Sequence, residues 1–398
     1  MTASAMGAEL GLEGPYGMLM EPGPTLVDPR VSAAAGQPPV HHLHPEFQSV
    51  VDRVAHDLSY VTGTERSTVI PATGRGGIEA ATASLGFDGQ RILVLRNGEF
   101  GDMLYAIASR QRADVRSYDV PPARPFDLSE VERIADDWHP HLIMTVHSES
   151  STGMLNDAGS IAAIARTSGA LFLLDAVSSA GALALDADRI GADLTVTASQ
   201  KALGGLTGLS SVSWSDRALE ALHGRSRDAD QFYLDLRRWW DVWLTESDGG
   251  LAKPGARRLP WSMPTALVFA LDTALGLLRE ETLETRSIRH SVMAERFRTL
   301  VREFGYSTLV DDTIASPSLT ALTPPPHVTA SEVVASVAAA GIRIAGGIGA
   351  LGGRIVRVGH MAESARPRPL ALTAVALGEA VGARIDLGPS ITWMEHGR

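Results

Sequence analysis

Lys201 is the residue of this sequence whose type and position most clearly suggest chemistry. It ends the apolar stretch Asp193-Leu-Thr-Val-Thr-Ala-Ser-Gln-Lys201, and it is one of only two lysines, the other being Lys253. A lysine amine can lose its proton near neutral pH and attack a carbonyl carbon, whereas an arginine guanidinium stays charged. A biased codon usage would explain why lysine is rare, but not why this one follows a strand of the buried type. The position therefore predicts a Schiff-base lysine.

Polar side chains end two further apolar runs. Asp175 follows Leu171-Phe-Leu-Leu174, where its carboxylate could pair with a protonated ring nitrogen and turn the ring into an electron sink. Aspartate is also favoured at the start of a helix, so the residue alone fits both roles. The second run ends in Thr145-Val-His-Ser-Glu-Ser-Ser-Thr-Gly153, whose hydroxyls and carboxylate equally suit a site or a turn.

A glycine-rich stretch, Pro71-Ala-Thr-Gly-Arg-Gly-Gly-Ile-Glu79, follows a short apolar run and opens a helix. Small residues let backbone N–H groups approach an anion at a helix N-terminus, so a phosphate site is one interpretation. Most loops of this composition are only turns. The spacing is neither that of a Walker loop nor that of the dinucleotide fingerprint.

The elements that must position these residues are indicated by apolar runs alternating with helical stretches between residues 45 and 220. The runs lie at 91–95, 141–146, 170–174, 193–196 and 209–213. Such a pattern predicts an α/β fold with a mostly parallel sheet, and ligands gather beyond the carboxyl ends of its strands. We expect an N-terminal arm (1–40), a large domain (41–280) and a smaller C-terminal α/β domain (281–398).

The amino-acid composition limits the classes of ligand and the kinds of chemistry that the protein can have. The formal net charge of -11 argues against nucleic acid and against an anionic membrane, so a small molecule is the expected ligand. The absence of cysteine excludes disulfides and thiolate catalysis. Neither a signal peptide nor a membrane-spanning run is readable, which favours the cytoplasm. The histidines His41, His42 and His44 lack a second ligand cluster, so we expect a surface turn there and no metal site.

Taken together, these residues resemble the fold-type I, class V pyridoxal-phosphate enzymes, which include the alanine:glyoxylate, serine:pyruvate and ureidoglycine:glyoxylate aminotransferases. The resemblance covers nearly the whole chain, and its most specific pair is Asp175-Ala-Val followed by Ser199-Gln-Lys201-Ala-Leu. Thr73-Gly-Arg-Gly-Gly-Ile-Glu-Ala is most similar to the ureidoglycine branch. The family implies a seven-stranded-type sheet, pyridoxal 5'-phosphate as cofactor and a homodimer with a shared active site.

The resemblance also implies a role for each matching residue. Lys201 would bind the cofactor covalently and shuttle protons, and Asp175 would pair with the pyridine nitrogen. The other implied cofactor contacts are Phe100 and Val177 on the two ring faces, Ser150 at the phenolic edge, and Thr73, Gly74, Arg75 and Gln200 around the phosphate. Arg357 would bind the substrate α-carboxylate through planar bidentate geometry, together with Gly23. Considered alone, Arg357 would be read as a surface charge.

The sequence departs from the family around the substrate. Family members carry a Tyr or His and a Thr before the long helix, and these reach the phosphate in the neighbouring subunit. Here the stretch reads Leu259-Pro-Trp-Ser-Met-Pro264, so Pro260 and Met263 replace both donors and Ser262 is the available substitute. These changes do not affect the assignment of the cofactor. They weaken the assignment of the protein as an ordinary glyoxylate transaminase.

The main functional prediction is an aminotransferase that moves an amino group from a small amino acid to a 2-oxo acid such as glyoxylate or pyruvate. The alternative is a specialised-metabolism enzyme of the same fold, a C–S lyase or decarboxylating deaminase similar to lincosamide-pathway enzymes. Trp240, Trp243 and Trp261, expected near the site opening, favour that alternative. A cofactor-sensing regulator would need a DNA-binding module, and a nicotinamide dehydrogenase would need a glycine fingerprint; neither is readable.

Overall fold

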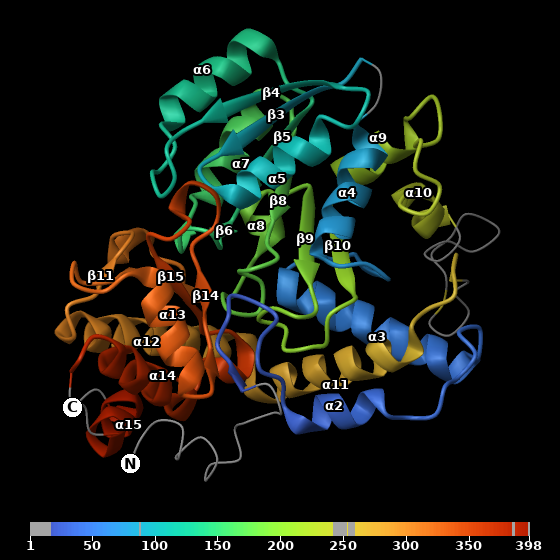
Figure 1. Cartoon of the computed structure of the whole chain (residues 1–398). Coiled ribbons are helices and arrows are strands. Elements are labelled where there is room, and N and C mark those ends of the chain that lie inside the picture. Colours follow the sequence, from blue (N-terminus) through green and yellow to red (C-terminus); the bar gives the residue numbers. More distant parts are fainter. Residues whose placement is uncertain (1–16, 87–88, 242–252, 254–258, 384–386, 397–398) are drawn as a thin grey trace.

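A seven-stranded sheet forms the centre of the molecule (Figure 1). The computed structural model describes residues 17–86, 89–241, 253, 259–383 and 387–396. In spatial order the strands are β2 (Ser67–Ile70), β10 (Ser210–Trp214), β9 (Leu194–Ala198), β8 (Leu171–Asp175), β5 (Leu142–Val146), β3 (Arg91–Arg96) and β4 (Asp114–Asp119). β10 runs antiparallel to its two neighbours, β2 and β9, and all other pairings in this sheet are parallel. The predicted mostly parallel α/β sheet is therefore confirmed.

Helices connect and cover these strands because β5, β8 and β9 are buried along almost their whole length and need cover on both faces. The helices of this region are α3 (Pro45–Thr62), α4 (Gly74–Leu85), α5 (Glu99–Ala108), α6 (Leu128–Trp138), α7 (Ala158–Thr167), α8 (Ala187–Ile190), α9 (Asp216–His223), α10 (Leu236–Trp239) and α11 (Thr265–Glu281). A short hairpin of β6 (Ser148–Glu149) and β7 (Met154–Leu155) follows β5.

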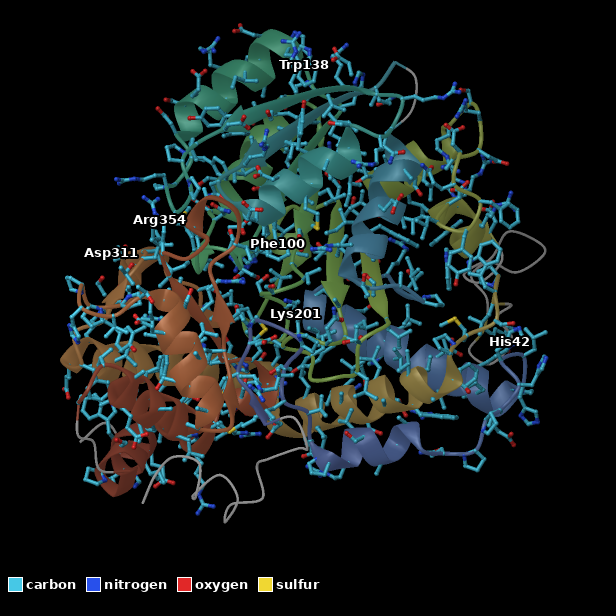
Figure 2. The ribbon with its side chains drawn as sticks, viewed as in Figure 1. His42, Phe100, Trp138, Lys201, Asp311 and Arg354 are labelled. Atoms are coloured by element: carbon cyan, nitrogen blue, oxygen red, sulfur yellow. The ribbon has the colours of Figure 1, made fainter. Side chains whose placement is uncertain are left out.

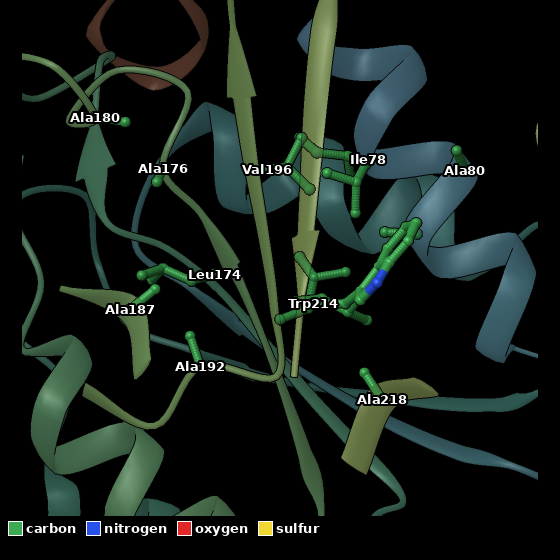
Figure 3. Close-up of a cluster of buried hydrophobic side chains, with 14 of the residues drawn as sticks. Ile78, Ala80, Leu174, Ala176, Ala180, Ala187, Ala192, Val196, Trp214 and Ala218 are labelled. Carbon is green, nitrogen blue, oxygen red and sulfur yellow. The ribbon is translucent and has the colours of Figure 1, made fainter. Parts of the chain in front are cut away.

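The start of α4 packs unusually close to the sheet. A Cβ added at Gly77 would lie 2.0 Å from the Ser210 Oγ, so no side chain fits there. The next residue, Ile78, is fully buried and lies beside Val196 of β9 (Figure 3). The small size of Gly77 thus allows α4 to pack closely on the sheet. This packing places the N-terminus of α4 next to the carboxyl end of β9.

A second cluster of buried apolar side chains lies in the C-terminal part, drawn orange and red in Figure 1. It is built from α12 (Leu283–Glu303), α13 (Ala330–Ala339), α14 (Pro367–Ala380), α15 (Leu387–His396) and a sheet in the order β11 (Ser307–Thr308), β12 (Leu319–Thr323), β15 (Val356–Gly359) and β14 (Ala345–Gly346). The short helices η2 (Asp312–Ile314), η3 (Gly349–Leu351) and η4 (Ala362–Ser364) connect them. Two separate clusters support the proposed domain boundary near residue 280.

The N-terminal segment joins this second cluster. β1 (Met18–Leu19) pairs in parallel with β13 (Ile342–Arg343), and Met18 and Met20 are buried there. Further on, α2 (Pro29–Ala35) packs on α11. Among the described residues, no helix is both long and apolar enough to cross a membrane.

Candidate functional site

A cavity of about 270 Å³ opens at the carboxyl ends of β5, β8 and β9, where a parallel sheet gathers its ligands. Ten of the twelve predicted site residues line it: Gly23, Thr73, Gly74, Arg75, Phe100, Ser150, Asp175, Val177, Gln200 and Lys201. The remaining lining residues, which sequence reasoning did not single out, are Ile78, Met103, Val146, Ser148 and Ser178. Figure 2 shows Lys201 and Phe100 in the middle of the molecule, close to the C-terminal part.

Lys201 is almost completely buried at the cavity wall. Its side chain is 8% exposed, and its Nζ donates a hydrogen bond to the carbonyl oxygen of Pro22. Burial lowers the pKa of Lys201 from 10.5 to about 8, although the nearby Asp175 carboxylate opposes the shift. A far larger share of the amine is therefore unprotonated at neutral pH than in an exposed lysine, as a nucleophile requires.

Gly23 allows the N-terminal segment to reach the lysine. Its φ is +97°, and an added Cβ would lie 2.4 Å from the Lys201 Cδ. Because this backbone conformation and this contact both disfavour a side chain, glycine is required at the position. Gly23 thus holds the chain across the Lys201 side chain.

Asp175 ends β8 at the bottom of the cavity and is 3% exposed. The Val177 N–H donates a 3.0 Å hydrogen bond to Oδ1. Burial raises the pKa of Asp175 to about 7, and the negative charge of Glu149 contributes further. A turn and not a helix follows Asp175, so the residue is not a helix cap. A cation placed at its second oxygen would relieve the cost of burying this carboxylate.

The N-terminus of α4 forms the anion-binding part of the cavity. The Thr73 side chain makes no capping hydrogen bond, so the N–H groups of the first turn, which lack partners within the helix, stay available. The Gln200 Oε1 is buried without a hydrogen-bond partner among the described residues, which leaves this amide able to rotate towards a ligand. Arg75 adds an exposed positive charge. A phosphate group fits this arrangement.

Two half-buried apolar side chains line the same cavity as Lys201 and the N-terminus of α4. Phe100 comes from the first turn of α5, and Val177 from the turn after β8. Beside them the Ser150 hydroxyl donates a 2.6 Å hydrogen bond to the Ser178 Oγ. A flat ring fits between apolar faces, with the two hydroxyls at its polar edge. Ser178 could have been found from the sequence, because it directly follows Asp175-Ala-Val.

Arg357 does not line the cavity but lies directly behind it on β15. It is 7% exposed, and its Nη1 and Nε donate 2.9 Å hydrogen bonds to the carbonyl oxygens of Ser150 and Gly346. Its charge also lowers the pKa of Lys201, which indicates proximity to the amine. Among the described residues it forms no ion pair within 4.0 Å. Arg357 is thus a buried cation at the site and not a surface charge.

Ser262, Trp240 and Trp261 do not line the cavity. Ser262 is exposed and outside the cavity. Its neighbour Trp261 stacks on Tyr233, with ring centroids 4.9 Å apart, while Trp240 packs against the buried Trp214. Trp243 falls outside the described residues. Within one chain, neither Trp240 nor Trp261 lines the cavity, and their expected place near the site opening stays a prediction.

The described residues contain no cluster of three or more metal-ligating side chains. In the histidine triple, the rings of His41 and His42 stack with centroids 4.6 Å apart. His44 instead pairs with Glu46 through a 2.6 Å contact at the exposed start of α3. The absence of a metal site at these histidines stays a prediction.

Comparison with known proteins gives similar chains over nearly the whole length. The family model Aminotransferase class-V matches residues 30–238. Alanine–glyoxylate aminotransferase of Oryctolagus cuniculus is 30% identical over 371 residues, which is 92% of this chain and 93% of that protein. The solved alanine–glyoxylate aminotransferase of Nostoc sp. is 31% identical with a TM-score of 0.87, covering 93% and 96% of the two chains. The ureidoglycine-glyoxylate aminotransferase of Bacillus subtilis is 28% identical with a TM-score of 0.88, covering 96% and 98%.

Pyridoxal 5'-phosphate is the cofactor of enzymes of this kind, and the cavity fits it. The open N-terminus of α4 suits a phosphate, and the apolar side chains of Phe100 and Val177 in the cavity lining suit a ring. The buried Asp175 carboxylate suits a protonated ring nitrogen, and the Lys201 amine suits the aldehyde. On the family match and this geometry, the chain belongs to the class-V aminotransferases, which are pyridoxal-phosphate-dependent enzymes.

Proposed function

We propose that this protein transfers the amino group of a small amino acid to a 2-oxo acid such as glyoxylate or pyruvate. The observation that carries the proposal is one cavity lined by a buried amine, Lys201, and a buried carboxylate, Asp175, with the buried guanidinium of Arg357 close enough to lower the pKa of the amine. Relatives named for alanine, ureidoglycine and glyoxylate support small substrates of this class.

Each residue has a role that follows from its surroundings. When bound, pyridoxal phosphate supplies an aldehyde for the incoming amino group and a ring that withdraws electrons from the substrate Cα. The Lys201 amine, with its pKa lowered to about 8, would remove the Cα proton and deliver it to the carbon atom that was the cofactor's aldehyde carbon. Asp175 would keep the ring nitrogen protonated, and the first turn of α4 would hold the phosphate. Burial of the site would exclude water from these steps.

Two half-reactions test the proposal. A transaminase retains the donor's amino group on its cofactor until a 2-oxo acid removes it, so a donor added alone should convert the cofactor stoichiometrically to pyridoxamine phosphate. Alanine, serine and glycine are the donors to try, with absorbance spectra before and after glyoxylate or pyruvate. Steady release of ammonia or CO₂ from a thioether amino acid, without pyridoxamine phosphate, would refute transamination and favour the lyase or decarboxylating deaminase.

Arg357 is proposed to bind the substrate carboxylate. Loss of a charge-assisted bidentate contact costs about 1.5 to 3 kcal/mol, so Arg357→Ala should weaken amino-acid binding roughly tenfold or more. The cofactor should remain bound, because Arg357 does not line the cofactor cavity. Titration of the loaded enzyme with an amino acid and with the matching amine checks this. Equal binding of both by the wild type would contradict it.

A homodimer with a shared site is also proposed. The aromatic group of Phe232, Tyr233 and Trp261 supports it, because the first two are exposed in the single chain at 61% and 41%. The adjacent Ser262 is also exposed and would contribute to the partner's phosphate site. Sedimentation should give a dimer, and a fully active monomer would contradict the proposal.

A cytoplasmic location of the protein stays a prediction.

A further inference from the structure

Glu149 is a completely buried carboxylate next to the cavity that has no role in the chemistry described above. It is 0% exposed and stands at the end of β6, between Ser148 and Ser150. Burial raises the pKa of Glu149, while the hydrogen bonds that it accepts oppose the shift. An acidic side chain is seldom fully buried unless it is well partnered, so its partners indicate its purpose.

Those partners belong mainly to the first turn of α5. Oε2 accepts hydrogen bonds from the N–H groups of Phe100 and Gly101, at 3.2 and 3.1 Å. Oε1 accepts the Ser151 N–H at 3.0 Å and the Ser151 hydroxyl. Ser151 in turn accepts the Glu99 N–H at 3.1 Å through its Oγ. The Glu149–Ser151 turn therefore receives the first N–H groups of α5.

The helix has no cap of its own. Its N-cap residue is Gly98, which has no side chain, and an added Cβ there would lie 2.5 Å from the Glu149 Cδ. The position that would normally supply a capping oxygen is thus occupied by a carboxylate from another strand. A negative group also suits the positive end of the helix dipole.

Phe100, which lines the cavity, stands in this anchored turn. Its own N–H is one of the groups that Glu149 holds, so a shift of the carboxylate would move the ring directly. The Glu149–Ser151 turn also supports Arg357, whose Nη1 donates a hydrogen bond to the Ser150 carbonyl oxygen.

We propose that Glu149 is a positioning residue, which sets the Phe100 ring against the cofactor through the first turn of α5. The proposal rests on the proposed cofactor site. It differs from an ordinary capping role in one respect: loss of Glu149 should change cofactor binding through Phe100, and not merely the stability of the fold.

The test is a double-mutant cycle on cofactor affinity. Glu149→Gln keeps the side-chain length but turns an NH₂ group towards N–H donors, which should weaken pyridoxal-phosphate binding by the apoprotein about tenfold. Phe100→Leu, which removes the ring, should weaken it by a similar factor. If Glu149 acts through Phe100, the double variant should bind little worse than Phe100→Leu alone. Independent, multiplying effects would overturn the proposal.

Asp235→Asn is the matched control. Asp235 is 1% exposed, caps α10, pairs with Arg225 at 2.8 Å and does not line the cavity. The Asp235→Asn variant should have a lower unfolding temperature than the wild type but the same cofactor affinity.

A Glu149→Gln variant that lost stability but bound the cofactor as tightly as the wild type would show that Glu149 is a purely structural cap. If Glu149→Gln does not fold, Glu149→Asp replaces it in the cycle. This variant keeps the charge but shortens the reach to α5, and its effect on cofactor affinity should likewise be non-additive with that of Phe100→Leu. The two proposals can fail separately. If the wild-type apoprotein does not bind pyridoxal phosphate, the proposed cofactor site is wrong. If it binds but the effects of the Glu149 and Phe100 variants multiply independently, only the role of Glu149 is wrong.

Discussion

Replacing Lys201 by alanine should abolish covalent attachment of pyridoxal phosphate and lower kcat by roughly 10⁴-fold or more. The reason is that Lys201 supplies both the nucleophilic amine and the group that moves the Cα proton. The only other lysine, Lys253, is exposed and does not line the cavity, so it cannot substitute. Absorbance of the loaded protein, and borohydride reduction followed by peptide mapping, measure the attachment.

The matched control is Lys253→Ala, which should leave spectrum and turnover unchanged. In the wild type, reduction should label the peptide that contains Lys201. Labelling of Lys253 alone, or a protein that takes up no cofactor, would show that the buried amine has another purpose. The lowered pKa of Lys201 would then need a different explanation.

Replacing Asp175 by asparagine should leave the cofactor bound but slow exchange of the substrate Cα proton by about two to four orders of magnitude. Burial raises the pKa of this carboxylate to about 7. A protonated ring nitrogen at its free oxygen would lower that pKa and stabilise the carboxylate, since opposite charges favour each other's ionised form. A neutral amide cannot do this, and the ring loses its power to withdraw electrons. NMR in deuterated water measures the exchange.

Asp193→Asn provides the comparison, because Asp193 is also a buried aspartate but lies before β9 and pairs with Arg217 at 2.9 Å, away from the cavity. Its loss should affect stability and not exchange. Undiminished exchange in the Asp175 variant would mean that the carboxylate only organises the turn through Val177.

The sequence by itself determined the fold and the edge of the sheet at which the chemistry lies. Apolar runs alternating with helices predict a parallel sheet, and the strands of a parallel sheet end at a common edge. Asp175 and Lys201 were therefore expected at the same edge, because both follow such runs. The glycine-rich stretch before Ile78 could be placed at a helix start for a similar reason, because small residues tolerate close approach. These inferences depend on local pattern, which a sequence contains in full.

Tertiary structure alone decided what depends on residues far apart in the chain. Lys201 contacts Pro22, 179 residues away, and Arg357 contacts Ser150, 207 residues away. Whether Asp175 was a helix cap stayed open until the turn after β8 was known, and whether Arg357 was a surface charge stayed open until its burial was known. The anchoring of α5 by Glu149 had no sequence signal, because its donors are backbone N–H groups that any residue carries. The pKa values of Lys201 and Asp175 depend on desolvation, and desolvation exists only after the chain has closed around them.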